Sequence, residues 1–227
     1  MLEIQQKGNM KKYLSILQNC ELFSGIELEG LLALLTCLNG KIKNYMKDEF
    51  VFQEGKQTKL SGILISGALQ IVEYDYNGNR TIISTLEPLQ LFGEAYSFCN
   101  QNLPITIEAS EDSIVLLINS LKIANPCQNS CNMHSILINN LVKILSDKNI
   151  KQNQKIQCLS KRTTRDKLLN YLSSQSQKNG SREFYIPYDR QQLADYLCVE
   201  RSAMAYEISK LCKDGIIKTK KNHFEFL

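Results

Sequence analysis

The sequence predicts an α+β chain: an N-terminal β jelly-roll barrel, a long dimerisation helix and a C-terminal winged helix-turn-helix. Three observations predict this order. Short β-type runs separated by turn residues fill 42–118, a helical pattern of about 30 residues follows Pro126, and two short helices lie between Asp189 and Gly215. We expect a β-barrel domain at 1–125, the dimerisation helix at 126–158 and the winged helix-turn-helix domain at 159–227.

The N-terminal part begins with an intermittent apolar stripe over residues 8–40, which predicts helix with a break near Ser24-Gly25. The sequence pattern then changes to short runs rich in branched apolar residues, and Asn77-Gly78 between two of these runs indicates a hairpin. Several short strands at regular spacing favour a β-sandwich or jelly-roll barrel.

The long helix is predicted to start after Asn125-Pro126, since proline suits the first helical turn. Leu137, Leu141 and Ile144 follow one another at coiled-coil spacing. A helix of this length between two domains is long for a domain interior, so we expect these three residues to form a dimer seam.

The segment 189–215 has the pattern of a helix-turn-helix. Asp189 and Gln192 can form a capping box at the first helix, and Gly215 can end the second. Met204, Ile208 and Leu211 are spaced to face inward. The second helix of such a motif enters the DNA major groove; an ordinary helical hairpin is the alternative for this segment taken alone.

Charge is divided unevenly along the chain. Residues 151–227 hold 15 Lys and Arg against 8 Asp and Glu, a net charge of +7, whereas residues 1–150 hold 12 against 15, a net charge of −3. Because neutralised phosphates supply most non-specific binding to nucleic acid, this asymmetry favours DNA as the partner of the C-terminal part.

Other classes of protein are disfavoured. No apolar run is long enough to span a bilayer, and the N-terminus lacks the order of a signal peptide, so we expect a cytoplasmic protein without a membrane partner. In that compartment the eight cysteines are expected to be thiols or ligands. No histidine precedes residue 134 and no nucleophile motif is present, which argues against an enzyme.

Taken in order, these parts resemble the Crp/Fnr superfamily of dimeric bacterial transcription regulators over about 22–227. The most specific matches are Phe92-Gly93-Glu94, the segments 161–169 (KRTTRDKLL) and 190–197 (RQQLADYL), and Arg201 to Met204 (RSAM). The resemblance implies a cyclic-nucleotide-binding-like barrel that holds an effector, and a homodimer that binds a two-fold, sequence-specific operator. RNA polymerase is a further candidate partner.

The resemblance also assigns DNA contacts. Arg190 is expected to hold a phosphate, and Arg201, Ser202 and Tyr206 to face base edges or the adjacent backbone. Tyr206 departs from the arginine that many members have there, and a phenol cannot make a bidentate guanine contact, so we expect a different operator. Cys198 stands where a turn glycine is common. The complete expected set is Arg190, Gln191, Arg201, Ser202, Ala205 and Tyr206.

The resemblance places the effector pocket around Gly93-Glu94. The segment 95–106 contains no Lys or Arg, so a buried cyclic phosphodiester there would be uncompensated, which argues against cyclic AMP and leaves no cofactor assigned. Gly93 and Glu94 can also have structural roles alone, Gly93 in a turn of the barrel and Glu94 in supporting it. The expected pocket residues are Gly93, Glu94, Ala95, Tyr96 and Thr106.

Two alternatives remain open. Cys127, Cys131 and His134 share one face of a helix at spacings of four and three, a pattern compatible with a metal or redox sensor, although the same face continues into apolar residues typical of a core. The barrel could also act as an effector-binding module that does not bind DNA. The outward Arg201, Ser202 and Tyr206 argue against that second alternative.

Overall fold

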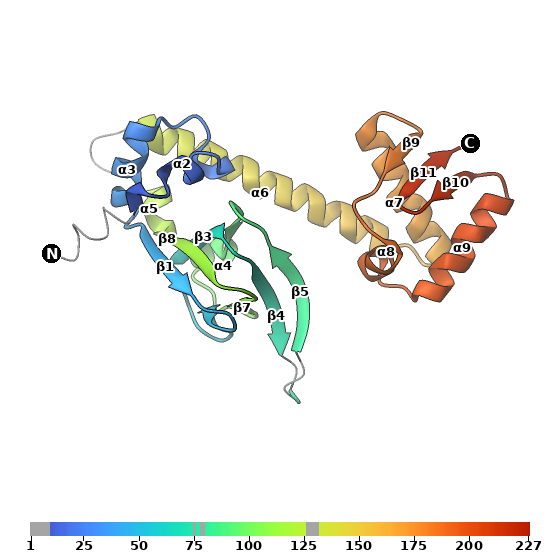
Figure 1. Cartoon of the computed structure of the whole chain (residues 1–227), viewed down its shortest axis with the longest axis horizontal. Coiled ribbons are helices and arrows are strands. Elements are labelled where there is room, and N and C mark those ends of the chain that lie inside the picture. The colour runs from blue at the N-terminus through green and yellow to red at the C-terminus, as the bar shows by residue number, and fades with distance from the viewer. Residues whose placement is uncertain (1–9, 75, 78–79, 126–131) are drawn as a thin grey trace. The chain divides into compact units, whose positions relative to one another are not determined.

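A computed structural model describes residues 10–74, 76–77, 80–125 and 132–227 (Figure 1). The chain divides into two compact units, residues 1–145 and 146–227. This division places its boundary inside the long helix, whereas the sequence suggested boundaries on either side of that helix. No helix among the described residues is long and apolar enough to cross a membrane.

The first unit begins with helices and continues as strands, as the change of sequence pattern predicts. Its helices are α2 (Leu14–Leu17), the 3-10 helix η1 (Glu21–Phe23), α3 (Leu28–Cys37), α4 (Glu94–Cys99) and α5 (Ser120–Ala124). Its strands are β1 (Lys41–Tyr45), β2 (Phe50–Phe52), β3 (Leu60–Ser66), β4 (Leu69–Tyr74), β5 (Arg80–Leu86), β6 (Leu91–Phe92), β7 (Thr106–Ala109) and β8 (Ser113–Asn119). The break expected near Ser24-Gly25 separates η1 from α3, where Gly25 has a φ of +78°.

The strands form two four-stranded antiparallel sheets, ordered β1-β8-β3-β6 and β2-β7-β4-β5. Leu64, Val115 and Leu117 of the first sheet share a buried cluster with Leu69 and Ile107 of the second. Alternate residues of a strand point to opposite faces, so each sheet contributes one apolar face to this shared core. The β4–β5 pairing confirms the predicted hairpin, although Gly78 lies outside the described residues.

A second buried cluster joins α2, α3, the outer face of the first sheet and the beginning of α6 (Asn132–Leu159). Leu137, Leu141 and Ile144 of α6 belong to this cluster and are 0%, 7% and 9% exposed. The structure thus corrects the interpretation of these residues as a dimer seam. Their heptad-like spacing has an intramolecular cause, because they pack on the N-terminal helices of their own chain.

The second unit contains the rest of α6, α7 (Thr164–Asn179), the helix pair α8 (Arg190–Leu197) and α9 (Arg201–Lys213), and three short strands. Strands β9 (Glu183–Tyr185), β10 (Ile217–Lys220) and β11 (His223–Phe226) form an antiparallel sheet in the order β10-β11-β9. We call β10, β11 and their connecting turn the wing. This arrangement confirms the winged helix-turn-helix.

The helix ends follow the local sequence. Asp189 Oδ1 accepts the Gln192 amide at 2.8 Å, and Gln192 Oε1 accepts the Asp189 amide at 2.9 Å, which completes the predicted capping box. Cys198 then ends α8 in the left-handed region, with φ 51° and ψ 57°. A side chain is disfavoured in that conformation, which explains why a glycine is common there.

We expect Cys198→Gly to raise the free energy of unfolding by about 0.5–1 kcal/mol, because relief of the left-handed conformation outweighs the added freedom of the unfolded chain. Chemical denaturation of the full chain measures the change. Cys198→Ala is the matched control, since alanine removes the thiol and keeps the strain; an equal gain from alanine would contradict the backbone explanation.

Candidate nucleic-acid interface

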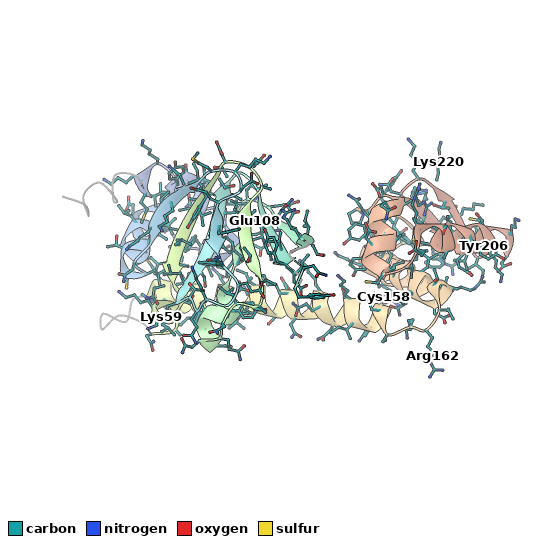
Figure 2. All side chains as sticks on the ribbon, turned by 90° about the horizontal axis from the view of Figure 1, so that it is seen from below. Lys59, Glu108, Cys158, Arg162, Tyr206 and Lys220 are labelled. Carbon is teal, nitrogen blue, oxygen red and sulfur yellow. The ribbon has the colours of Figure 1, made fainter. Side chains whose placement is uncertain are left out.

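The scaffold of the interface is the packing of α8 on α9. Leu193, Ala194 and Leu197 of α8, and Met204 and Leu211 of α9, are each 0% exposed and belong to one cluster. Ala194 has only a methyl group, so the two helices can approach closely. This buried face leaves the opposite face of α9 to solvent: Arg201, Ser202, Ala205 and Tyr206 are all exposed, Tyr206 by 67% (Figure 2).

Two polar contacts tie α7 to this helix pair. Arg165 donates to Asp214 Oδ2 at 2.8 Å and lies 3.7 Å from Glu207 Oε2, which ties α7 to α9 and the residue after it. Lys167 Nζ donates to the Leu197 carbonyl at 3.2 Å, at the end of α8. Two basic side chains of the 161–169 motif are therefore engaged within the unit and orient the helices.

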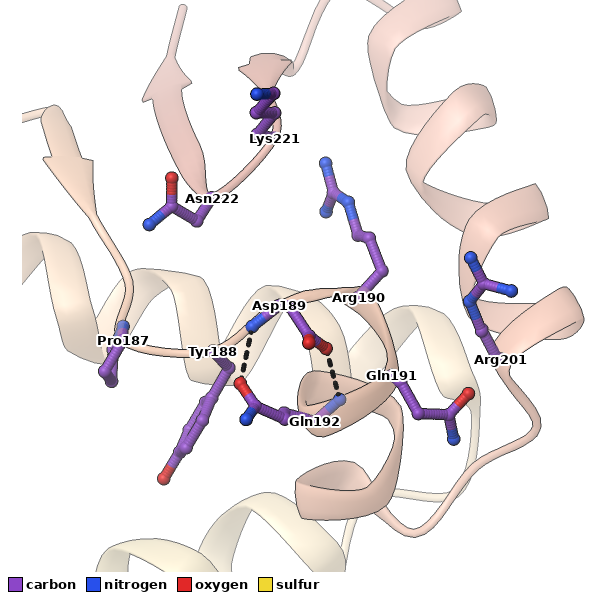
Figure 3. Close-up of a pocket in the computed structure, with 9 residues that line it drawn as sticks. All are labelled: Pro187, Tyr188, Asp189, Arg190, Gln191, Gln192, Arg201, Lys221 and Asn222. Atoms are coloured by element: carbon purple, nitrogen blue, oxygen red, sulfur yellow. Dashed lines mark hydrogen bonds between the residues drawn. The ribbon is translucent and has the colours of Figure 1, made fainter.

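Between the start of α8 and the wing lies a groove of about 690 Å³, which we call the α8–wing groove (Figure 3). Its charged side chains are three cationic groups and the capping carboxylate of Asp189. A second groove adjoins it along α9 and shares Arg190 and Arg201. The α8–wing groove is lined by Pro187, Tyr188, Asp189, Arg190, Gln191, Gln192, Arg201, Lys221 and Asn222.

Arg190 connects the wing to both grooves. Its Nη2 donates to Thr219 Oγ1 at 2.8 Å, and its guanidinium carbon lies 4.8 Å from the centre of the Phe224 ring. Burial lowers the pKa of this guanidinium, which is nevertheless ionised at neutral pH as arginine is in proteins. Its Nη1 is buried and has no hydrogen-bond partner among the described residues. A buried cationic donor without a partner is suited to an anionic oxygen.

The structure brings together most of the predicted DNA-facing residues. Arg190, Gln191 and Arg201 line the α8–wing groove, while Ser202 and Ala205 line the groove along α9. Tyr206 lies further along the same exposed face of α9 (Figure 2). Sequence reasoning missed Lys221 and Asn222, which lie in the turn of the wing. The basic run Lys218-Thr219-Lys220-Lys221 in the predicted wing was the signal that could have found them.

The predicted effector residues do not present one polar surface. Ala95 is exposed, Glu94 is 5% exposed, and Thr106 Oγ1 accepts the Glu54 amide at 3.2 Å. Gly93 has a φ of +74°, and a Cβ there would lie 2.7 Å from the Phe52 ring. Backbone conformation and packing are therefore sufficient reasons for this glycine without a ligand.

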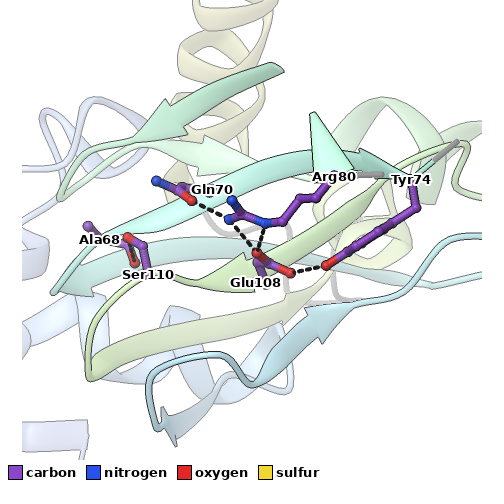
Figure 4. Close-up of polar contacts among 6 residues, drawn as sticks. All are labelled: Ala68, Gln70, Tyr74, Arg80, Glu108 and Ser110. Atoms are coloured by element: carbon purple, nitrogen blue, oxygen red, sulfur yellow. Dashed lines mark hydrogen bonds and ion pairs between the residues drawn. The ribbon is translucent and has the colours of Figure 1, made fainter. Parts of the chain in front are cut away.

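A polar network that the sequence did not predict joins strands β4, β5 and β7 (Figure 4). Arg80 Nε donates to Glu108 Oε1 at 2.7 Å, and its Nη2 donates to Gln70 Oε1 at 2.5 Å. Tyr74 donates to Glu108 Oε2 at 2.9 Å, and this hydrogen bond to Glu108 raises the pKa of Tyr74. Glu108 is only 6% exposed, so Arg80 is the partner that compensates a buried carboxylate.

The predicted metal alternative is only partly described. Cys127 and Cys131 lie outside the described residues, whereas His134 is buried in α6, with 1% exposed. Within the described ranges, no group of three or more His, Cys, Asp and Glu side chains is placed to hold a metal ion.

The comparisons identify the fold. The family described as "Cyclic nucleotide-binding domain" matches residues 42–130. No curated protein sequence matches the chain. Among solved structures, a cysteine-to-serine variant of CprK complexed with OCPA has a TM-score of 0.59 and 14% identity, over 86% of this chain and 88% of that one.

Two further solved structures are similar over most of their length. The catabolite activator protein of Thermus thermophilus has a TM-score of 0.54 and 17% identity, over 91% of this chain and 93% of that one. A CooA mutant from Carboxydothermus hydrogenoformans has a TM-score of 0.54 and 16% identity, over 86% and 85% of the two chains. The resemblance to Crp/Fnr regulators is thereby confirmed at the level of the fold.

We expect Thr219→Val to lower the free energy of unfolding by about 1–2 kcal/mol, because the hydroxyl that accepts from Arg190 and donates to the His223 carbonyl is lost. Denaturation of the full chain, followed by circular dichroism, measures the loss. Lys218→Ala, an exposed change on the same strand, is the control. Equal stabilities of Thr219→Val and the parent would show that this contact does not hold the wing.

Proposed function

We propose that the protein is a sequence-specific DNA-binding transcription regulator that acts as a homodimer. The observation that carries the proposal is the exposed polar face of α9 beside the α8–wing groove, where Arg190, Arg201 and Lys221 gather next to a helix pair whose inner faces are buried. A recognition helix needs this combination of rigid support and exposed side chains to reach base edges in a major groove.

The contacts divide into two kinds. Arg190 is half-buried and held by the wing, so its guanidinium can meet a phosphate at a fixed position but cannot extend to a base. Arg201 is exposed at the first turn of α9, the part of a recognition helix that contacts base edges. Lys221 in the wing is placed to add a phosphate contact. No effector is assigned, and the paired Arg80 offers no free cation for a cyclic phosphate.

The dimer seam is proposed on another face of α6. Ile138, Val142 and Leu145 continue, at alternating spacings of four and three, through Asn149 and Gln152 to Ile156 and Leu159. Val142, Leu145 and Ile156 are 56%, 37% and 63% exposed. A second copy of α6 fits this seam, because a heptad pattern of apolar residues on one helix is self-complementary, and the polar Asn149 and Gln152 within it favour one register.

Arg201→Ala and Arg190→Ala are expected to differ in their effect on operator binding. Arg201→Ala removes a base contact and should reduce the discrimination against other sequences by about 1–3 kcal/mol. Arg190→Ala removes a phosphate contact, so it should weaken binding to all sequences alike. It should also reduce by about one the slope of the logarithm of affinity against the logarithm of salt concentration. Operator selection followed by fluorescence anisotropy at several salt concentrations measures both effects.

Lys178→Ala is the matched control for the DNA-binding experiment, because Lys178 is exposed in the last turn of α7 and lines neither of the two grooves. Uniform losses in both arginine variants would refute the division into base and phosphate contacts. Parent protein that binds random DNA as tightly as selected DNA would refute sequence-specific binding.

Val142→Glu should shift the protein from dimer to monomer, because it places a charge in the apolar seam and leaves the buried cluster of the first unit intact. Analytical ultracentrifugation gives the mass, and Lys143→Glu is the control, since Lys143 is exposed and lies off the seam. A Val142→Glu variant that dimerises like the parent would exclude this face.

A further inference from the structure

The ring of Tyr206 projects from α9 into solvent (Figure 2). Its side chain is 67% exposed and makes neither a hydrogen bond nor a ring contact with any other residue that the structure describes. By contrast, Tyr171, Tyr188 and Tyr196 of the same unit pack on one another, with ring centres 5.1, 5.3 and 6.1 Å apart. An aromatic ring buries a large apolar area when it meets a partner. Tyr206 is therefore free to make such a contact with whatever α9 binds.

The neighbours of Tyr206 on the helix surface leave room for that partner. Residues three and four positions apart lie side by side on a helix. At these positions Ser202, Ala203 and Ser209 are exposed and small, and Lys210 is exposed and cationic. None of the four carries a carboxylate. A flat, negatively charged molecule such as DNA can thus approach the ring without meeting a bulky or acidic side chain.

The chemistry of a phenol limits which base it can read. In the major groove, guanine presents two acceptors, adenine an acceptor and a donor, cytosine a donor, and thymine an acceptor and a methyl group. The phenol of Tyr206 has a single donor, so it cannot make the two-donor contact that selects guanine. Its large apolar ring has one apolar counterpart among these base edges, the thymine methyl group.

We propose that Tyr206 is a specificity-determining residue whose ring packs on the methyl group of a thymine in the major groove, so that each half-site requires a T·A pair at this position. The inference rests on the proposed function, because it names a base that α9 reads. Tyr206 lies five residues after Arg201, or about 7.5 Å along the helix, and base pairs are about 3.4 Å apart. We therefore expect the thymine about two base pairs from the pair that Arg201 contacts.

The test removes the methyl group and the ring separately. In the selected operator, each thymine is replaced in turn by deoxyuridine, which lacks only the methyl group, and binding of the full chain is followed by fluorescence anisotropy. One replacement in each half-site should weaken binding of the parent about fourfold, as expected for loss of one buried methyl group. Tyr206→Phe keeps the ring and should show the same loss, whereas Tyr206→Ala should bind the thymine and uracil operators equally.

Tyr185→Ala is the matched control variant. Tyr185 is a tyrosine of the same unit that is 70% exposed, and it lines neither of the two grooves. Its ring centre lies 4.7 Å from that of His223 on the neighbouring strand. This variant should keep the fourfold difference between the thymine and uracil operators.

Three results would overturn the role of Tyr206 while leaving sequence-specific binding intact. The parent could tolerate uracil at every position, or Tyr206→Ala could discriminate thymine from uracil as well as the parent does. Tyr206→Phe could also weaken binding to all sequences alike, which would assign the hydroxyl to a phosphate. Parent protein that binds random DNA as tightly as selected DNA would instead refute the proposed function, and this inference with it.

Discussion

The interface depends on one constraint, the complete burial of the inner faces of α8 and α9. A fully buried leucine or methionine contributes roughly 1.5–3 kcal/mol relative to an exposed one, so rotation of α9 that exposed Met204 and Leu211 would be costly. The same packing fixes which side chains face outward. Arg201, Ser202 and Tyr206 are exposed together because the residues between them in the helical repeat are held inside.

The basic side chains of the second unit orient its helices, in addition to supplying positive charge to its grooves. Arg165 donates a hydrogen bond to Asp214, directly after α9, and Lys167 donates one to the Leu197 carbonyl at the end of α8, so two basic side chains of the 161–169 segment hold the helices in place. Arg190 combines both roles. Its contacts with Thr219 and Phe224 hold the wing, and its buried Nη1, which has no hydrogen-bond partner among the described residues, is suited to an anionic oxygen.

The long helix α6 has two apolar faces with different environments. Leu137, Leu141 and Ile144 close the core of the first unit, whereas Val142, Leu145 and Ile156 remain exposed. Both sets have heptad-like spacing. A helix that closes a domain core and pairs with a second copy needs both faces, and the pattern of one face alone does not show which partner it has.

The sequence by itself determined the order of elements, the capping box of α8, the change from helical to β-type texture and the outward face of α9, because these features depend on local conformation and on periodicity within one segment. Only the tertiary structure decided that Leu137 packs on its own chain, that Arg80 compensates Glu108 and that Lys221 joins the groove. Each of these depends on contacts between residues far apart in the sequence, and local pattern carries no information about which distant side chain will be the neighbour.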